Sequence, residues 1–205
     1  MSDPSSVSCA WDPRRCTGTP QCPPRCPRFI DATGTPLVVR PYTESDRNAL
    51  ESMYEDFDPV HRAQGLPPLS PDRRSRGLSR MLDEGRNFVA EREGDIVGHT
   101  LFTPTDQAIP ELAVFVHQSV HGQGIGTECC KHAIAAAADA GHDALELHVE
   151  RHNRAARSVY RSLGFELEGH HGPELRMRLS LSGTIATRVQ QAPAVRLAAD
   201  SEASV

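Results

Sequence analysis

The sequence lacks any apolar run near the roughly 20 residues that a bilayer-spanning helix needs, so we expect no membrane association. Its start, MSDPSSVSCA, has neither a basic region nor an apolar core, which argues against a secretory signal. It also lacks an excess of positive charge, because the formal net charge is −5. Nucleic-acid binding usually needs a basic face, so we expect no nucleic-acid partner. Together these absences favour a cytoplasmic protein with one globular domain.

Four of the six cysteines lie near the N-terminus, in a segment without helical or strand periodicity. They are Cys9, Cys16, Cys22 and Cys26. Disulfides rarely persist in a reducing cytoplasm, and four thiolates are enough ligands for a tetrahedral zinc site. Only the spacing from Cys22 to Cys26 is as short as zinc sites favour. Residues 1–36 are therefore either an arm that zinc holds together or a reduced, loosely ordered one.

Regular patterns cover residues 37–182, which we expect to form the domain, and residues 183–205 are expected to be a flexible tail. Apolar alternation predicts strands at residues 37–40, 87–91, 95–102, 109–116, 144–149, 165–168 and 175–181. Helical spacing and capping residues predict helices that begin near Thr43, Pro71, Ile125 and Asn153. This order predicts a mixed α/β fold, with a central mixed sheet of about six to seven strands flanked by about four helices.

A glycine-rich loop (residues 121–126) stands between the strand at residues 109–116 and an alanine-rich helix. Glycine permits positive φ and a close approach to the backbone, and a helix N-terminus adds a partial positive charge. The pattern therefore favours a phosphate-binding loop, with a tight structural turn as the alternative. It is not a Walker loop, because no lysine follows Gly126, and its glycine spacing differs from the dinucleotide fingerprint.

The wider sequence resembles the GNAT superfamily of N-acetyltransferases over about residues 37–181. The family signature Gln/Arg-x-x-Gly-x-Gly/Ala is met by residues 121–126, where His121 departs from the usual Gln or Arg. A second pattern, Asn-x-x-Ala-x-x-x-Tyr-x-x-x-Gly-Phe, is filled by Asn153, Ala156, Tyr160, Gly164 and Phe165. The resemblance implies a GNAT-type fold and acetyl-CoA as the cofactor.

The resemblance also implies where the cofactor lies. Its pyrophosphate would rest on the amides of His121, Gly122, Gln123, Gly124, Ile125, Gly126 and Thr127. Its pantetheine arm would bond to the backbone of Val114, Phe115 and Val116, at a place where two strands splay apart. Asn153 is expected to cap its helix and is a candidate cofactor ligand. Tyr160 matches the family's acid for the departing thiolate, with a core aromatic as the alternative.

Acetyl transfer to an amine also requires loss of a proton, because an ammonium group has no lone pair. Glu111 is the first choice for the base, since the family often has a glutamate near that position. Glu146 and His148, on the next strand, are its rivals, and each of the three could instead be a solvated surface residue. Cys129 and Cys130 are expected to be packing residues rather than nucleophiles.

We therefore expect an N-acetyltransferase that moves an acetyl group to a primary amine by direct attack. The acceptor would be a small-molecule amine or a protein amino group, bound near residues 58–71 and 103–108. A homodimer is one assembly that the sequence leaves open. The alternatives are a non-catalytic acetyl-CoA-binding module whose cysteine-rich arm recruits a partner, and a zinc-dependent binding protein.

Overall fold

The structure is a computed structural model that describes residues 11–58, 68 and 70–202, with side chains up to residue 199. Its strands are β1 (Arg28–Ile30), β2 (Pro36–Pro41), β3 (Arg86–Arg92), β4 (Asp95–Thr103), β5 (Glu111–Val116), β6 (Ala144–Glu150), β7 (Glu166–His171) and β8 (Glu174–Ser180). Its helices are α1 (Arg47–Glu55), α2 (Pro71–Glu84), α3 (Ile125–Asp139), α4 (Arg154–Ser162), α5 (Thr184–Gln190) and α6 (Pro193–Glu202).

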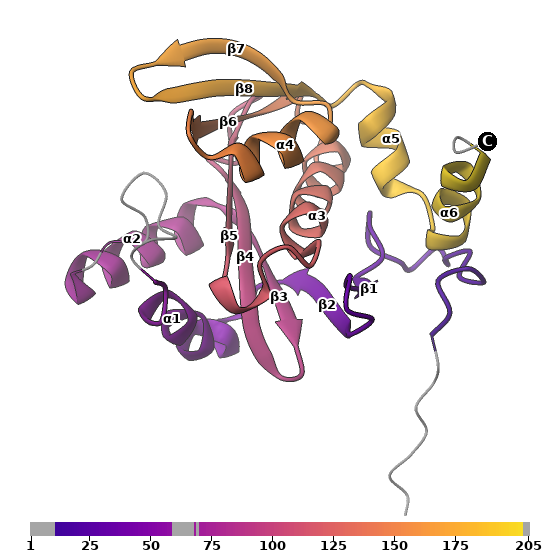
Figure 1. The fold of residues 1–205 in the computed structure, drawn as a ribbon, viewed down its shortest axis with the longest axis horizontal. Helices are drawn as coiled ribbons and strands as arrows, with labels where there is room; N and C mark the ends of the chain where they lie inside the picture. The colour runs from indigo at the N-terminus through magenta and orange to yellow at the C-terminus, as the bar shows by residue number, and fades with distance from the viewer. Residues whose placement is uncertain (1–10, 59–67, 69, 203–205) are drawn as a thin grey trace, which may run out of the picture.

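Within the described residues the strands form one eight-stranded sheet in the order β1-β2-β3-β4-β5-β6-β8-β7. All neighbouring strands are antiparallel except β5 and β6, which are parallel. Helices α1 and α2 pack on one face of the sheet, and α3 and α4 lie on the other (Figure 1). The predicted mixed α/β fold is confirmed, and every element expected between residues 37 and 182 is present.

Helix α3 lies against the middle of the sheet because its side chains are small. Cys129, Ala133 and Ala137 are completely buried there, and their small size lets the helix approach the strands closely. Burial raises the pKa of Cys130 to about 12 and also raises the pKa of Cys129. Both thiols therefore stay protonated at neutral pH, which agrees with their expected role in packing.

The two ends of the chain differ from the expectation. Residues 11–36, expected as an arm without regular structure, contribute the short edge strand β1. Residues 183–205, expected as a flexible tail, form α5 and α6 over their described part, with Ala186 and Val189 buried in the main core. Periodicity missed β1 and α5 because a strand of three residues and a helix of seven are too short to show a pattern.

A buried ion pair joins the N-terminal arm to the domain. Arg25 donates from Nε and from a terminal nitrogen to the two carboxylate oxygens of Glu128 on α3, at 2.7 and 2.8 Å. Its other terminal nitrogen donates to the carbonyl of Val189 on α5 at 2.7 Å. Burial acts to raise the pKa of Glu128, but His132 and Arg25 outweigh it and lower the pKa. One arginine thus ties together the arm, α3 and the C-terminal helices.

Among the described helices, none combines the length and the apolar composition that crossing a membrane requires.

We predict that Glu128→Gln lowers the free energy of unfolding by about 3 kcal/mol, because it leaves the buried Arg25 charge without a counterion. The matched control is Glu84→Gln, which removes the exposed pair of Arg80 and Glu84 on α2 and should cost at most about 0.5 kcal/mol. Urea unfolding followed by circular dichroism measures both. Equal losses for the two variants would contradict a structural role for the buried pair.

Candidate active site

Strands β5 and β6 lie side by side only at their beginnings. Their single register pair is Glu111 with Glu146, and the Glu146 N–H donates to the carbonyl of Pro110 at 3.1 Å. Strand β5 stays paired with β4 along its whole length, up to Val116 opposite Gly98. The sheet therefore opens into a V between β5 and β6, as the resemblance implied for strands at this position.

The open side of β5 presents backbone groups to this V. The N–H of His117 donates to Val97 in β4, and backbone groups along a strand alternate in direction. The N–H and C=O groups of Val114 and Val116 therefore face β6, beyond the one register pair. The carbonyl of Val116 accepts a hydrogen bond from Nε2 of His121 at 2.9 Å. The ring of His121 is thus engaged with the end of β5.

The glycine-rich loop leads directly from this V into α3. Gly122 and Gly124 adopt φ values of 75° and 86°, which a residue with a Cβ atom adopts only under strain. The first helical donor is the N–H of Glu128, bonded to the carbonyl of Gly124 at 3.1 Å. In the described part of the chain, no hydrogen bond has an N–H of residues 122–127 as its donor. These amides, with the helix dipole behind them, form a cradle suited to an anion.

The N-terminal arm braces the loop from outside. The N–H of Ala32 donates to the carbonyl of Gln123 at 3.1 Å, and Arg92 donates to the side-chain oxygen of Gln123 at 2.6 Å. Arg92 also donates to the hydroxyl of Thr35 and lies 3.4 Å from the carboxylate of Asp31. Asp31 in turn accepts the N–H groups of Thr33 and Thr35.

Sequence reasoning missed this brace. A signal for it was present, because Asp-Ala-Thr-Gly-Thr at residues 31–35 is typical of a turn closed by an aspartate side chain. Burial acts to raise the pKa of Asp31. The hydrogen bonds from Thr33 and Thr35 and the charge of Arg92 outweigh burial, so the pKa lies below its usual value. The carboxylate is therefore ionised at neutral pH and keeps the turn in shape beside the loop.

Tyr160 lies on α4, the helix that follows β6, and Asn153 is the residue that caps its N-terminus. The ring of Tyr160 contacts Phe165 edge to face, with centroids 5.8 Å apart, and packs on the main core. Burial and the nearby Cys130 raise its pKa, and within the described residues its hydroxyl has no hydrogen-bond partner. Asn153 accepts the N–H of Ala156 at 3.0 Å, which confirms its role as the helix cap. The hydroxyl of Tyr160 is thus protonated at neutral pH, and within the described residues it donates to no acceptor.

Two of the three candidate bases lie in contact. Nδ1 of His148 is 3.0 Å from a carboxylate oxygen of Glu111. Because a carboxylate accepts, Nδ1 carries the proton, and Nε2 is left with its lone pair. From the register pair Glu111–Glu146, His148 lies two residues further along β6, at the level where the V opens. Glu146 points to the same face of β6, and among the described residues it makes no hydrogen bond through its side chain.

An apolar cavity of about 160 Å³ opens on the same face of β5 as Glu111. It is lined by Tyr54, Pro68, Arg74, Gly77, Leu78, Met81 and Phe115. The hydroxyl of Tyr54 donates to Nδ1 of His99 at 2.6 Å, and His99 donates from Nε2 to Asn87 at 2.9 Å. Burial lowers the pKa of His99 to about 3, so the ring is neutral at neutral pH. The row of hydrogen bonds from Tyr54 through His99 to Asn87 is therefore uncharged, and it fixes the position of Tyr54 in the cavity wall. Of the loop at residues 58–71, where we expected the acceptor, residues 59–67 and 69 lie outside the described residues.

The arrangement of strand, glycine loop and helix has counterparts among known proteins. The sequence profile of the acetyltransferase (GNAT) family matches residues 50–165, which is more than half of the chain. The chain belongs to the GNAT acetyltransferase family. The arm, β8, α5 and α6 lie outside the matched segment.

Solved structures agree with this membership. The ribosomal-protein-alanine N-acetyltransferase from Brucella melitensis is 27% identical, with a TM-score of 0.58 over 70% of this chain and 99% of its own. The GNAT domain of S. lividans PAT is 19% identical, with a TM-score of 0.65 over 75% of this chain and 96% of its own. YncA from Salmonella typhimurium, solved with its cofactor acetyl-CoA, is 21% identical, with a TM-score of 0.57 over 71% and 94%.

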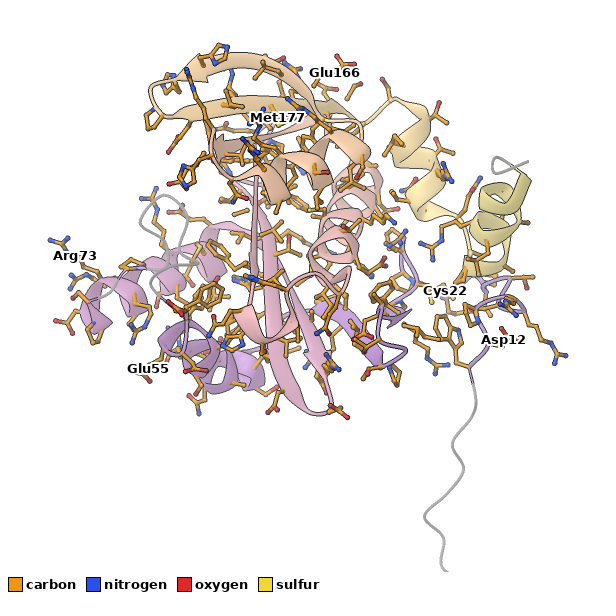
Figure 2. The ribbon with its side chains drawn as sticks, viewed as in Figure 1. Asp12, Cys22, Glu55, Arg73, Glu166 and Met177 are labelled. Carbon is orange, nitrogen blue, oxygen red and sulfur yellow. The ribbon has the colours of Figure 1, made fainter. Side chains whose placement is uncertain are left out.

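The structure gives no support to a zinc site in this GNAT protein. Among the described residues, no group of three or more His, Cys, Asp or Glu side chains could hold a metal ion. Cys22, labelled in Figure 2, accepts the N–H of Thr19 at 3.3 Å, and the carbonyl of Cys16 accepts the N–H of Ala194 on α6. Cys9, the fourth expected ligand, lies outside the described residues. The arm is held by Arg25 and by its contact with α6 instead.

We predict that Arg92→Gln loosens the glycine-rich loop, because it removes the charged donor shared by Gln123, Thr35 and Asp31. Amide hydrogen exchange at residues 121–127 should become at least about tenfold faster, since local opening then costs less. Arg86→Gln, an exposed position on the same strand, is the matched control. Unchanged exchange in the Arg92 variant would show that the loop holds its shape without the arm.

Proposed function

We propose that the protein is an acetyl-CoA-dependent N-acetyltransferase that transfers the acetyl group to a primary amine by direct attack. The observation that carries this proposal is the row of amides at residues 122–127, which donate no hydrogen bond within the described residues. They lie at the mouth of the V between β5 and β6. An anion bound to these amides lies at one end of the open edge of β5. A long, hydrogen-bonding arm can then run from the loop into the V.

The residues present fit the cofactor. Gly122, Gln123, Gly124, Ile125, Gly126 and Thr127 would hold its pyrophosphate with their amides, beside His121. Val114, Phe115 and Val116 would line its pantetheine arm, the two valines through backbone groups that face the V. A Cβ atom at Gly126 would lie 3.4 Å from the side chain of Val116, in van der Waals contact with the end of β5. When bound, acetyl-CoA supplies an activated acetyl thioester.

The pair of His148 and Glu111 is suited to take the proton from the acceptor amine. Glu111 fixes the ring of His148 by accepting from Nδ1, while Nε2 keeps the lone pair that receives the proton. This assigns Glu111, our first choice for the base, the role of positioning residue. Glu111 is also about 10 Å along the strand from Val114, at roughly 3.3 Å per residue, which is too far for direct contact with a group there.

Two donors would act on the charges that develop during transfer. The N–H groups of Val114 and Val116 face the V and can polarise the thioester carbonyl. The hydroxyl of Tyr160 can protonate the departing thiolate, since its raised pKa keeps the proton on the phenol until a stronger base arrives. Asn153, held as the cap of the same helix about two turns before Tyr160, is a candidate contact of the pantetheine arm.

The cavity that would receive the acceptor amine is lined mainly by apolar side chains. The cavity beside Phe115 has one cation, Arg74, and no carboxylate among its described lining residues. A polycationic amine would find no counter-charge there, so the cavity favours an amine with an apolar substituent. Both a small molecule and the end of a protein chain can meet this requirement. A homodimer stays a prediction, which sedimentation velocity tests.

We predict that Tyr160→Phe lowers kcat by about 10²-fold with little change in the KM for acetyl-CoA, because a general acid acts mainly in the transition state. Release of free CoA on a panel of amines measures this. The matched control is Tyr42→Phe, at a residue between β2 and α1 whose hydroxyl donates to Glu44. If the protein binds acetyl-CoA but releases no CoA on any amine, the alternative of a non-catalytic acetyl-CoA-binding module holds instead.

We predict that His148→Gln lowers kcat/KM for the amine by about 10²-fold, while Glu111→Gln lowers it less, because a positioning residue only biases the base. Initial rates of CoA release measure both variants. A larger loss in Glu111→Gln than in His148→Gln would make Glu111 the base.

A further inference from the structure

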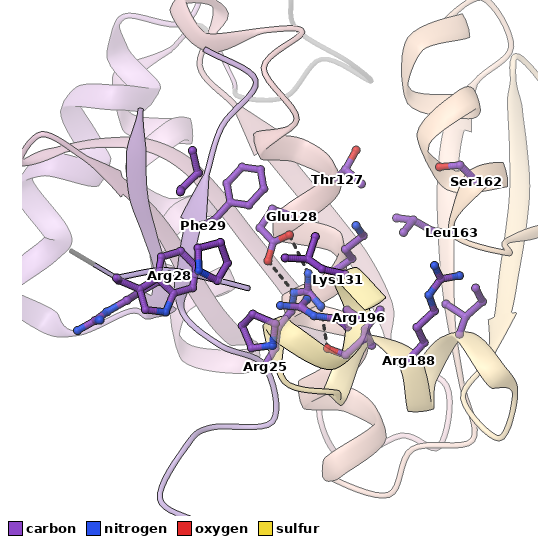
Figure 3. A pocket seen from close by; sticks show the side chains of 17 residues that line it. Arg25, Arg28, Phe29, Thr127, Glu128, Lys131, Ser162, Leu163, Arg188 and Arg196 are labelled. Atoms are coloured by element: carbon purple, nitrogen blue, oxygen red, sulfur yellow. Dashed lines mark hydrogen bonds and ion pairs between the residues drawn. The ribbon is translucent and has the colours of Figure 1, made fainter. Parts of the chain in front are cut away.

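Two cavities of this protein differ in their chemistry. The larger, of about 440 Å³, lies beside α3 between the arm and the C-terminal helices (Figure 3). Its described lining includes five cations and one carboxylate, Glu128, which bonds to Arg25. The smaller, of about 160 Å³, lies between α1, α2 and β5. Its described lining holds one charged side chain, Arg74, which bonds to Glu55. The smaller cavity is therefore the better suited to an apolar group.

Gly77 lies in the middle of α2, on the helix face that lines the smaller cavity. Arg74, Leu78 and Met81 line it as well, and with Gly77 they follow the spacing i, i+3, i+4, i+7 of a single helix face. Leu78 is buried and packs with residues of β3 and β4, so this face is turned toward the sheet. A side chain at residue 77 would therefore start from the cavity wall.

Neither the backbone nor the packing of α2 requires glycine at this position. Gly77 does not have a positive φ, and among the described residues no heavy atom lies within 4 Å of the place where its Cβ would stand. At Gly85, the C-cap of the same helix, a Cβ atom would lie 2.7 Å from the carbonyl oxygen of Met81. Apart from proline, glycine is the poorest helix former. Gly77 thus destabilises α2 without serving its conformation or its packing.

The walls of the cavity opposite α2 are aromatic. The rings of Tyr54 and Phe115 meet edge to face, with centroids 5.4 Å apart. Phe115 also stacks on His99, to which the hydroxyl of Tyr54 is bonded, so both walls are fixed. An engineered apolar cavity of about 150 Å³ binds benzene. This cavity is about the same size, at 160 Å³, and aromatic walls favour a ring.

Phe115 connects the cavity to the candidate active site. It stands on β5 between Val114 and Val116, whose backbone groups face the V, while its own side chain lines the cavity. Side chains alternate along a strand, so Glu111 lies on the same face of β5 as Phe115. An amine whose ring occupies the cavity therefore lies beside the middle of β5, where the thioester of the proposed cofactor would be held.

We propose that Gly77 determines acceptor specificity, because the space at its missing side chain admits a benzene-sized ring. The inference rests on the proposed function and narrows its substrate class to primary amines that carry an aryl group near the nitrogen. Arylalkylamines and peptides with an aromatic N-terminal residue share this chemistry.

The test compares matched acceptors with and without a ring. The probes are 2-phenylethylamine against ethylamine, and a tripeptide that begins with phenylalanine against trialanine. One methylene in an apolar pocket changes kcat/KM by about 10- to 200-fold, so the ring should raise kcat/KM at least about tenfold. A preference within the first pair identifies a small amine as the acceptor, and a preference within the second identifies a peptide. Either result supports the proposal, and no preference in either pair overturns it.

Gly77→Ala should lower kcat/KM for the preferred ring-bearing probe about tenfold, and Gly77→Leu about 10²-fold, with the ring-free probe unchanged. Gly77→Ala should also raise the midpoint of thermal unfolding by about 3 °C, because alanine favours the helix. A more stable protein that loses only the ring-bearing substrate cannot be explained by damage to the fold. Ser75→Ala and Ser75→Leu, at an exposed position of α2 outside the cavity lining, are the matched controls.

Failure of this inference differs from failure of the proposed function. If CoA is released but the ratio of the two kcat/KM values is the same in the wild-type protein and both Gly77 variants, this inference alone is overturned. If no probe releases CoA, the proposed function fails, and isothermal titration calorimetry then tests the ring site directly. The ring-bearing probe should bind the wild-type protein at least about tenfold more tightly than Gly77→Leu. Equal affinities would overturn the ring site as well.

Discussion

The departure of β6 from β5 after one register pair is the constraint on which the rest of the structure depends. A parallel strand that continued alongside would occupy the N–H and C=O groups of Val114 and Val116. Because β6 diverges, these groups face an open V, and the V ends at the amides of the glycine-rich loop. The register pair that precedes the divergence places His148 beside Glu111 at the opening. The open edge of β5, its junction with the glycine-rich loop and the position of the candidate base thus all depend on the place where β6 leaves β5.

The two ends of the chain add structure around the domain that the family profile matches. The arm fastens the glycine-rich loop through Ala32 and the Asp31 turn, and it is itself anchored by Arg25 on Glu128. Helices α5 and α6 close the far side of α3. A segment that composition presents as loose therefore supports the candidate cofactor loop and shapes a basic cavity beside it. The family profile does not extend to either end, so this support is a property of this chain.

Much of the central domain was predictable because its information is local. Alternation marks β3 and β4, Glu93 and Gly94 supply the positive φ values of their hairpin turn, and Asn153 is a strong cap. The glycine-rich loop was predictable for the same reason, since positive φ at Gly122 and Gly124 is a local demand. The contact of Glu111 with His148 was not, because the two are 37 residues apart and meet only through the pairing of β5 and β6.

The sequence by itself determined the element order of residues 37–182, the positive φ values of the glycine-rich loop and the membership of the GNAT acetyltransferase family. Only the tertiary structure decided the fate of both ends, the partner of His121, and the distribution of cations around α3. The physical reason is the sequence separation over which each interaction acts. Periodicity, capping and turn chemistry act over a few residues, whereas the burial of Arg25 with Glu128 acts over a separation of 103 residues and exists only once the chain has folded.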